Sequence, residues 1–255
     1  MKKLFNAQIK MLRSLSSKKG RAEHGVFLVE GVKAVSELIR SERTTDMIIF
    51  DPGFDHRSFM SAMPSDRVID IYTGDISRFS TVSAPEGIAA VGRYPRQIPQ
   101  EEFFRDKNSI LCLCGVSDPG NAGTLVRTAL CFGLDGVAVS DDCADLYSPR
   151  SLRSSMGAVF RMPVFRTSSF EQIMKDTTGY ERIGTYLDAC HDYSHKEGKR
   201  MLFLGNESSG LNEKLRKYMN SNFKINISPS FDSLNVSVAG GVILDRVFNR
   251  EAVKC

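Results

Sequence analysis

The stretch from Ser233 to Leu244 limits what this chain can fold into more than any other part of it. It reads Ser-Leu-Asn-Val-Ser-Val-Ala-Gly-Gly-Val-Ile-Leu, and positions 238–244 carry no polar side chain. A helix on a protein surface has polar residues at every turn, so we expect a helix buried on nearly all sides. Adjacent glycines cost a helix about 1 kcal/mol each relative to alanine. We expect another backbone or a ligand to approach Gly240 and Gly241 closely; a tightly packed core helix is the alternative.

Length and composition narrow the class of protein. A chain of 255 residues has room for two domains, and 42% hydrophobic with 25% charged residues is typical of a globular protein. No apolar run approaches the roughly 20 residues that span a bilayer, and the first residues lack the apolar core of a signal peptide. The six cysteines form no CxxC pair or zinc spacing. We therefore expect a cytoplasmic protein with reduced, mostly buried thiols, no metal and no membrane partner.

Residues 1–21 contain cations and no carboxylate. Such a block binds nucleic-acid phosphates by displacing their counterions. A solubilising basic tail would have the same composition, and charge alone does not separate the two. The candidate RNA contacts are Lys10, Arg13, Lys18, Lys19 and Arg21.

Strands and helices alternate over the first hundred residues, which predicts a small layered α/β domain. We expect helices at 4–15, 32–39 and from Asp75, a basic turn at 16–21, and strands at 26–31, 47–50, 68–72 and 87–91. No catalytic constellation occurs in this region. Two prolines in the aperiodic stretch 94–99 indicate a boundary. The predicted division is a first domain at 1–97, a linker at 98–107 and a second domain at 108–255.

Three loops of the second domain each follow a predicted strand. Strand 110–116 leads into a turn-rich loop at 118–123, strand 201–205 into 206–211, and strand 223–227 towards Ser233. Ligands of α/β sheets bind where strands end and helices begin, because free backbone N–H groups point outward there. We therefore expect the three loops to line one polar pocket with apolar walls.

A helix is expected from Thr124, which places Arg127 near its start. An arginine there opposes the helix dipole, so we expect it to serve an anionic ligand; an exposed arginine without a role is the alternative. The sequence has neither GxGxxG after a strand nor GxxxxGK[ST]. An ordinary dinucleotide site is therefore not expected, and a P-loop NTPase is excluded.

The three loop blocks, in this order, resemble the three motifs of the SpoU (TrmH-like) RNA ribose 2′-O-methyltransferases of the SPOUT superfamily. The first block is Asp118-Pro-Gly-Asn-Ala-Gly-Thr-Leu-Val-Arg127, the second Leu204-Gly-Asn-Glu-Ser-Ser-Gly-Leu211, and the third Ser233-Leu-Asn-Val-Ser-Val-Ala239. The leading domain resembles the family's substrate-binding domain, related to ribosomal RNA-binding proteins, at Phe27-Leu-Val-Glu-Gly31 and Ser83-Ala-Pro-Glu-Gly-Ile-Ala-Ala90.

The resemblance implies an α/β fold in which a trefoil-knotted methyltransferase domain follows a small ribosomal-protein-like domain. It also implies a homodimer that uses S-adenosylmethionine to methylate structured RNA, with ribosomal RNA favoured over transfer RNA. The implied catalytic residues are Arg127, Asn121, Glu207, Ser233 and Asn235. The implied cofactor-binding residues are Leu204, Gly205, Asn206, Ile225, Ile227 and Leu234.

Several alternatives stay open at this point. Arg127 is either a general base or a clamp for the adjacent phosphate, because removing a proton from a guanidinium is costly. Either protomer of a dimer could supply it. Asn226 and Pro229 replace the family's usual proline and glycine, which leaves the shape of the donor loop open. A catalytically silent ribosome-assembly factor and a base-methylating enzyme are the other functions considered.

Overall fold

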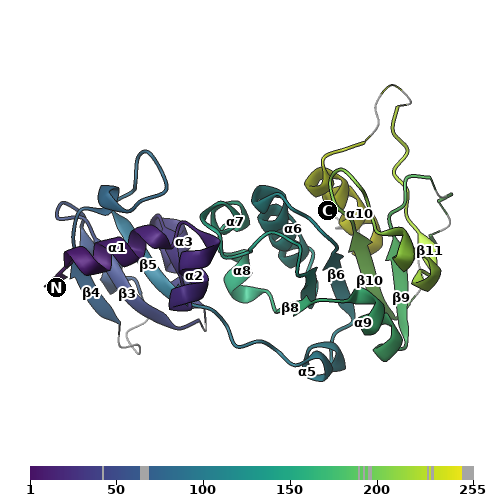
Figure 1. Ribbon diagram of the computed structural model, residues 1–255, viewed down its shortest axis with the longest axis horizontal. Helices are drawn as coiled ribbons and strands as arrows, with labels where there is room; N and C mark the ends of the chain where they lie inside the picture. Colours follow the sequence, from purple (N-terminus) through teal and green to yellow (C-terminus); the bar gives the residue numbers. More distant parts are fainter. Residues whose placement is uncertain are drawn as a thin grey trace, which may run out of the picture. The chain divides into compact units, whose positions relative to one another are not determined.

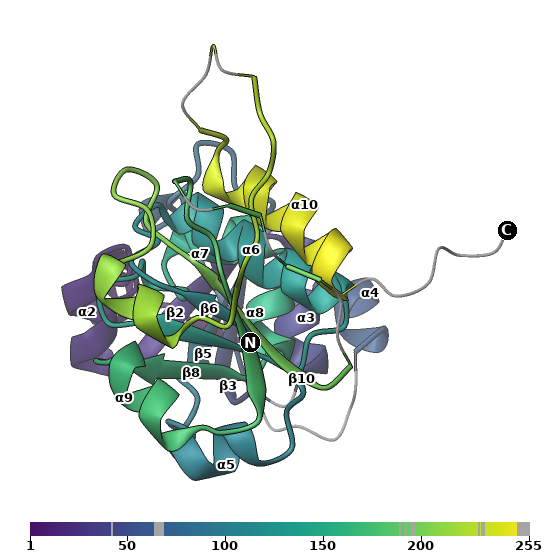
Figure 2. The same ribbon diagram turned by 90° about the vertical axis from the view of Figure 1, so that its right-hand side faces the viewer.

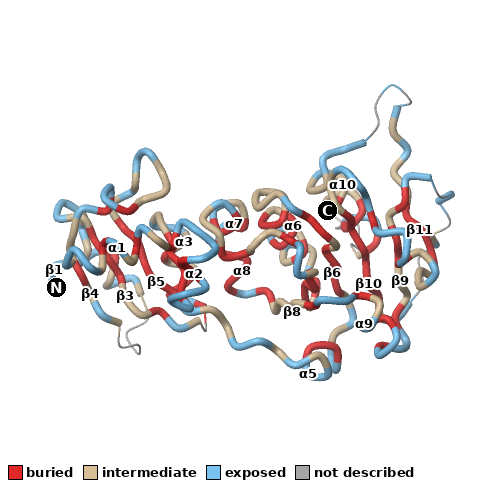
Figure 3. Tube along the Cα trace, viewed as in Figure 1, coloured by how far each residue is buried: buried red, intermediate tan, exposed pale blue. Residues whose placement is uncertain are grey.

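The computed structural model describes residues 1–41, 43–63, 69–188, 190–191, 193–194, 197–228, 230 and 233–248. The chain forms two compact units (Figure 1). The first comprises Met1–Arg96 with Asp145–Arg161, and the second comprises Gln97–Ala144 with Met162–Cys255. In both units the buried residues are concentrated on the strands, as the red segments of Figure 3 show. None of the helices in the described ranges has the length and apolar character needed to span a membrane.

A five-stranded mixed sheet forms the centre of the first unit. In spatial order its strands are β1 (Lys2–Lys3), β4 (Asp70–Thr73), β3 (Thr45–Phe50), β5 (Ile88–Arg93) and β2 (Val26–Glu30). β5 runs antiparallel to both of its neighbours, and the remaining pairs are parallel. The helical segments are α1 (Asn6–Ser14), α2 (Lys18–His24), α3 (Val32–Arg40), α4 (His56–Ser61), the 3₁₀ helix η1 (Ile76–Arg78), α7 (Pro149–Ser155) and α8 (Ala158–Arg161).

Most elements expected in this region are present, but the prediction of a basic turn at 16–21 was wrong, because a helix begins there at Lys18. Ser17 caps a helix that begins at Lys18, because its side chain accepts a hydrogen bond from the Gly20 backbone. The strand expected at 68–72 appears as β4, and Val68 itself lies outside the described residues.

Residues 145–161 belong to the first unit, although the predicted division assigned them to the second domain. A buried ion pair holds them there: Arg21 Nη2 lies 2.7 Å from Asp145 Oδ2, with the two side chains 3% and 14% exposed. Phe27 of β2 packs against Tyr147 and Phe160 at ring-centroid distances of 4.8 and 5.9 Å. The chain therefore leaves the second unit after Ala144 and returns to it at Met162.

Six parallel strands form the sheet of the second unit. Their spatial order is β11 (Ser221–Asn222), β9 (Tyr180–Gly184), β10 (Lys199–Leu204), β6 (Ser109–Leu113), β7 (Gly136–Ser140) and β8 (Val164–Thr167). The helical segments are α5 (Gln100–Arg105), α6 (Pro119–Cys131), α9 (Phe170–Asp176), the 3₁₀ helix η2 (Glu213–Tyr218) and α10 (Val236–Phe248). α6 and α10 pack together on one face of the sheet, and α5 and α9 cover the other (Figure 2).

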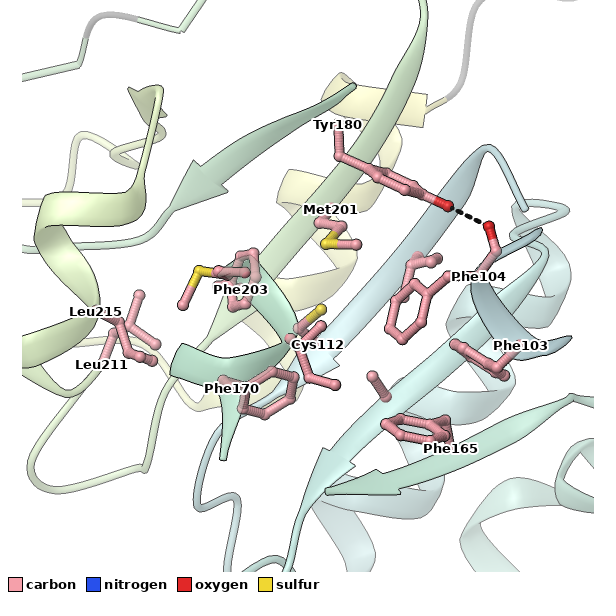
Figure 4. Close-up of a cluster of buried hydrophobic side chains, with 14 of the residues drawn as sticks. Phe103, Phe104, Cys112, Phe165, Phe170, Tyr180, Met201, Phe203, Leu211 and Leu215 are labelled. Carbon is pink, nitrogen blue, oxygen red and sulfur yellow. Dashed lines mark hydrogen bonds between the residues drawn. The ribbon is translucent and has the colours of Figure 1, made fainter. Parts of the chain in front are cut away.

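The core beneath α5 and α9 is rich in aromatic side chains. Figure 4 shows Phe103 and Phe165, whose ring centroids lie 5.3 Å apart, together with Phe170 against Phe203. The Tyr180 hydroxyl donates to the Phe104 carbonyl at 3.1 Å, so its polar end is satisfied inside this core. A filled core on this face holds the parallel strands in place, and their carboxyl ends form one edge.

The first motif is helical rather than a loop. α6 begins at Pro119, not at Thr124, because Asp118 caps it by accepting from the Asn121 backbone at 2.9 Å. Proline at the first helical position fits this start, since that residue needs no N–H donor. Arg127 consequently lies more than two turns into the helix, beyond the first turn, where the helix dipole would disfavour a cation.

The strand expected at 223–227 is absent. The ladder ends at Asn222, and residues 223–228 have no regular structure. Phe223 still donates to the Gly184 carbonyl at 2.8 Å, but the next backbone N–H, of Lys224, donates to His191 Nδ1 at 3.2 Å. The His191 side chain therefore accepts from the Lys224 N–H, and no carbonyl of the neighbouring strand β9 does so.

The terminal helix is buried on one side only. Its buried residues are Gly240, Ile243, Leu244 and Val247, whereas Val238 is 54% exposed. A Cβ on Gly240 would lie 2.3 Å from Leu125 Cδ2 of α6, so close approach is confirmed at this position. A Cβ on Gly241 would meet nothing within 4 Å, so no described part of this chain approaches that position closely. The chain by itself therefore does not bury the helix on nearly all sides.

Candidate functional site

The parallel strands bring the first two motifs together at the carboxyl edge of the sheet. β6 and β10 are neighbours, and beyond their ladder the Cys114 backbone N–H donates to the Leu204 carbonyl at 2.8 Å. The Asn206 side chain then donates to the Gly115 carbonyl at 2.8 Å. Its Oδ1 accepts from the backbones of Ser208 and Ser209, so this side chain determines the shape of the second motif's loop.

Glu207 connects the second motif to the first. Its carboxylate accepts from the Ser117 backbone at 3.2 Å and hydroxyl at 3.1 Å, from the Asp118 backbone at 3.2 Å, and from Asn121 Nδ2 at 3.1 Å. Partial burial alone would raise the pKa of Glu207. Hydrogen bonds from the Asn121 side chain and from the backbones of Glu207, Ser117 and Asp118 outweigh it and lower that pKa below 4.5. Glu207 is therefore an ionised acceptor at neutral pH.

Asn121 and Asn235 connect the first motif to the third. Asn235 Nδ2 donates to Asn121 Oδ1 at 3.1 Å. Asn235 Oδ1 accepts from the Ser237 backbone at 2.9 Å, which satisfies a free donor at the start of α10. Glu207, Asn121 and Asn235 form one hydrogen-bonded chain, called here the carboxylate–amide chain.

A cavity of about 250 Å³ lies beside this chain. Gly205 shapes it: a Cβ there would lie 2.1 Å from the Gly210 carbonyl carbon, so no larger residue fits. Its walls combine apolar side chains, among them Ile225 and Ile243, with backbone of the second motif. This mixture suits an adenosine group, which needs apolar contact and a few fixed polar partners. All the predicted cofactor-binding residues line the cavity: Leu204, Gly205, Asn206, Ile225, Ile227 and Leu234.

The structure gathers four of the predicted catalytic residues and leaves one apart. Glu207 and Ser233 line the cavity, and Asn121 and Asn235 connect to it through the carboxylate–amide chain. Arg127 is exposed on α6 and does not line the cavity. Within the described ranges no hydrogen bond or ion pair engages its guanidinium. Pro229, expected to alter the donor loop, lies outside the described residues.

Four of the five predicted RNA contacts are exposed, and the fifth, Arg21, is buried. Lys10, Lys18 and Lys19 are exposed on α1 and α2, and so is Arg13, which also donates to the Arg78 carbonyl. Arg21 was wrong as an RNA contact: besides its ion pair with Asp145, it donates to the Leu15 and Ser16 carbonyls. Its guanidinium is a structural group inside the first unit.

Free thiols were expected, and the five described cysteines are free. Burial of most of them was only partly correct. Cys112 and Cys143 are buried, Cys114 is intermediate, and Cys131 and Cys190 are exposed. Cys255 lies outside the described residues.

The residues of the site that sequence reasoning missed include Ser117 and Lys224. Ser117 contributes two donors to Glu207, and its position directly before the first motif was the available signal. Lys224 lines the cavity beside Ile225, and it is the one cation within the stretch that was taken for an apolar strand.

Comparisons with known proteins agree with this arrangement. A family model described as "SpoU rRNA Methylase family" matches residues 108–245, and one described as "MRM3-like substrate binding domain" matches residues 6–90. The 23S rRNA guanosine 2′-O-methyltransferase RlmP of Bacillus subtilis is 31% identical, over 94% of this chain and 95% of that protein.

Solved structures show the same fold along almost the whole chain. A putative RNA methyltransferase of the TrmH family from Porphyromonas gingivalis matches with a TM-score of 0.83 and 27% identity, over 97% of this chain and 99% of that one. An AdoMet-bound rRNA methyltransferase from Sinorhizobium meliloti matches with a TM-score of 0.82 and 25% identity, over 96% of each chain. With its three motifs joined at one cavity and both family models matched, the chain belongs to the SpoU rRNA methylase family.

Proposed function

We propose that this protein transfers a methyl group from S-adenosylmethionine to a ribose 2′-hydroxyl of structured RNA, and that the RNA is large-subunit ribosomal RNA. The observation that carries the proposal is the carboxylate–amide chain, which joins all three motifs beside a cavity suited to an adenosine group. The names of several relatives support ribosomal RNA, including the Bacillus subtilis protein that acts on 23S rRNA.

The chemistry requires little covalent help from the protein. S-adenosylmethionine supplies an activated methyl group on a good leaving group, so the protein's task is to position the 2′-oxygen in line and to assist one proton. Glu207 is a poor general base, because its pKa is lowered and its oxygens already accept several hydrogen bonds. Its role is to fix Asn121, which together with Asn235 orients the ribose.

Arg127 is a further catalytic candidate, as a general base or as a clamp for the adjacent phosphate. Loss of the guanidinium lowers kcat in either case. Arg127→Lys separates the two roles: a base is partly rescued at raised pH, whereas a bidentate phosphate clamp is not.

The protein acts as a homodimer in this proposal, with Arg127 of one protomer serving the cavity of the other. Support comes from the exposure of Arg127 on α6, away from the cavity lining, and from exposed apolar residues near α10, where Leu234 is 41% and Val238 54% exposed. Dimerisation would cover that apolar surface. Sedimentation of the purified chain tests the oligomeric state.

Mixing two variants that are each strongly impaired tests which protomer supplies Arg127. If Arg127 acts across the dimer, Arg127→Ala mixed with Glu207→Gln creates one site with both residues intact, and activity returns. If Arg127 acts within its own protomer, every site in the mixture lacks one residue and activity stays low. Each variant assayed alone is the control.

Three further features belong to the proposal. The second unit carries the family's trefoil knot, as its match to SpoU and TrmH-family structures supports. The enzyme works in the cytoplasm, where its free thiols stay reduced. RNA binds the first unit through Lys10, Arg13, Lys18 and Lys19, which are exposed cations.

Transfer of a labelled methyl group to total RNA from a strain lacking this gene tests the substrate. We expect the label in large ribosomal RNA. Label in transfer RNA would retain the chemistry and change the substrate; a Synechocystis relative carries a name that includes both substrates, tRNA/rRNA methyltransferase. Failure to bind the donor would instead support a silent assembly factor.

A further inference from the structure

Two of the described residues that line the donor cavity carry a charge: Glu207 and Lys224. The carboxylate of Glu207 accepts hydrogen bonds from Ser117, Asp118 and Asn121. These hydrogen bonds connect the first and second motifs, and they occupy the oxygens of the Glu207 carboxylate. Lys224 is therefore the cation that the described part of the cavity offers to a ligand.

The backbone of Lys224 is held firmly although it lies outside any strand. Its N–H donates to His191 Nδ1 at 3.2 Å, and the His191 ring contacts Phe223 edge to face at a centroid distance of 4.8 Å. These contacts fix the position of the Lys224 backbone on the cavity wall, just beyond the end of the sheet. Lys224 is half-buried there.

Among the described residues, Asp188 has a charge that interacts with the Lys224 ammonium. The hydrogen bond from Arg216 is the main cause that lowers the pKa of Asp188, and the charge of Lys224 adds to it. Arg216 Nη2 lies 2.6 Å from Asp188, and Arg216 also pairs with Glu213. In the described part of the chain no carboxylate or carbonyl lies within hydrogen-bonding distance of the ammonium. A partly buried cation on a cavity wall favours an anionic ligand group.

S-adenosylmethionine has one anionic group, the carboxylate of its amino-acid half; its other charges, on the sulfonium and the α-ammonium, are positive. We propose that the Lys224 ammonium binds this carboxylate and thereby fixes the direction in which the donor lies in the cavity. The amino-acid half lies towards Lys224, and the sulfonium lies nearer the negative charge of Glu207. This inference rests on the proposed function only in taking S-adenosylmethionine as the donor.

Removing the charge from the protein and from the ligand in turn tests the pairing. Calorimetry measures the binding of three ligands to the wild-type chain and to Lys224→Gln. S-adenosylmethionine has the carboxylate, decarboxylated S-adenosylmethionine lacks only that group, and 5′-methylthioadenosine lacks the whole amino-acid half. Lys214→Gln, on η2 and outside the cavity lining, is the matched control, and Lys224→Arg tests rescue of the charge.

We expect Lys224→Gln to weaken S-adenosylmethionine binding about tenfold, as loss of a partly exposed charged hydrogen bond does. The same substitution leaves the other two ligands unchanged, Lys224→Arg restores most of the affinity, and Lys214→Gln has no effect. Equal weakening of all three ligands would mean that Lys224 contacts the nucleoside half or only shapes the wall, and would overturn the proposal. Unchanged S-adenosylmethionine binding would overturn it as well.

These outcomes separate this inference from the proposed function. If Lys224→Gln binds all three ligands like the wild type while the wild type methylates RNA, only the role of Lys224 falls. If the wild-type chain binds none of the ligands, the methyltransferase proposal itself falls.

Discussion

Glu207 is the carboxylate that connects the motifs of the site, and in the proposed mechanism it positions other groups and does not transfer a proton. It joins Ser117, Asp118 and Asn121, and Asn121 passes the connection to Asn235. Glutamine at this position keeps the shape, but turns an N–H₂ group towards groups that are themselves donors. The consequences for stability and activity both follow from that mismatch.

For Glu207→Gln we expect a loss of about 1 kcal/mol in the free energy of unfolding at pH 7, and a fall in kcat of at least tenfold. The lowered pKa of Glu207 means that the folded state favours the ionised form. Its stabilising contribution is complete above pH 4.5, the ordinary value, and disappears as pH falls through the lowered pKa. Denaturation from pH 7 to pH 3 should show the two proteins converging in acid. A constant difference down to pH 3 would contradict this account.

Ser117 donates two hydrogen bonds to Glu207, and in the proposed mechanism it acts through Glu207 as a positioning residue. Ser117→Ala removes the hydroxyl donor, whose distance to Glu207 is 3.1 Å, but keeps the backbone donor. We expect kcat to fall about threefold with an unchanged KM for the donor, since one exposed hydrogen bond is lost. Ser117→Thr retains the hydroxyl and should recover the rate. A rise in KM without a change in kcat would assign Ser117 to donor binding instead.

At the scale of elements, the tight contact between α6 and α10 depends on Gly240. A Cβ there would lie 2.3 Å from Leu125 Cδ2 and 3.0 Å from Leu204 Cδ1, and both side chains are buried. Gly240→Ala should therefore cost about 1–2 kcal/mol of unfolding free energy, because overpacking exceeds the gain in helix propensity. Gly241→Ala, where the added Cβ meets nothing within 4 Å, should be neutral or stabilising by up to about 1 kcal/mol. Equal losses in the two variants, measured by urea unfolding, would contradict the asymmetry.

Sequence patterns predicted the elements whose signals are local. The apolar run at 26–31 became β2, and the cavity lining around Leu204, Gly205 and Ile225 followed from where strands end. The predictions were wrong where a hydrogen bond to a single side chain set the start or the end of an element. Asp118 starts α6 earlier than expected, and His191 takes the N–H of Lys224 and ends the strand. Hydrogen bonds of this kind depend on a single side chain, and the periodicity of apolar residues carries no information about them.

Burial of the last helix was misjudged for a related reason. An apolar sequence shows that a surface is covered, but not what covers it. Gly240 meets α6, whereas Gly241 and Val238 remain open in the single chain. An apolar stretch of this kind fits a surface that a second copy covers, which is how the proposed homodimer accounts for it.

At the scale of the whole molecule, residues 145–161 interrupt the sequence of the second unit and pack with the first. No compositional shift indicates this exchange, because it depends on the pairing of Arg21 with Asp145, far apart in sequence. The same pairing explains why Arg21 was mistaken for an RNA contact: a charge count does not distinguish a buried guanidinium from an exposed one.

Breaking this buried ion pair should destabilise the first unit strongly. For Asp145→Asn we expect a loss of about 3 kcal/mol in unfolding free energy, because the Arg21 charge remains buried without its partner. Asp46→Asn is the matched control: its partner Arg93 is 64% exposed, and the loss should stay below about 1 kcal/mol. Similar losses in the two variants would show that the Arg21–Asp145 pair does not secure the segment.

The central claim is that the cavity and the carboxylate–amide chain form a ribose 2′-O-methylation site. The most direct measurement is the chemical identity of the methylated nucleoside formed from large ribosomal RNA of a strain lacking this gene. Nuclease digestion and mass spectrometry should give one 2′-O-methylnucleoside, with alkaline cleavage blocked at that linkage, and Glu207→Gln should form at least tenfold less of it. A methyl group on a base, with the ribose unmodified and the linkage cleaved by alkali, would contradict the claim.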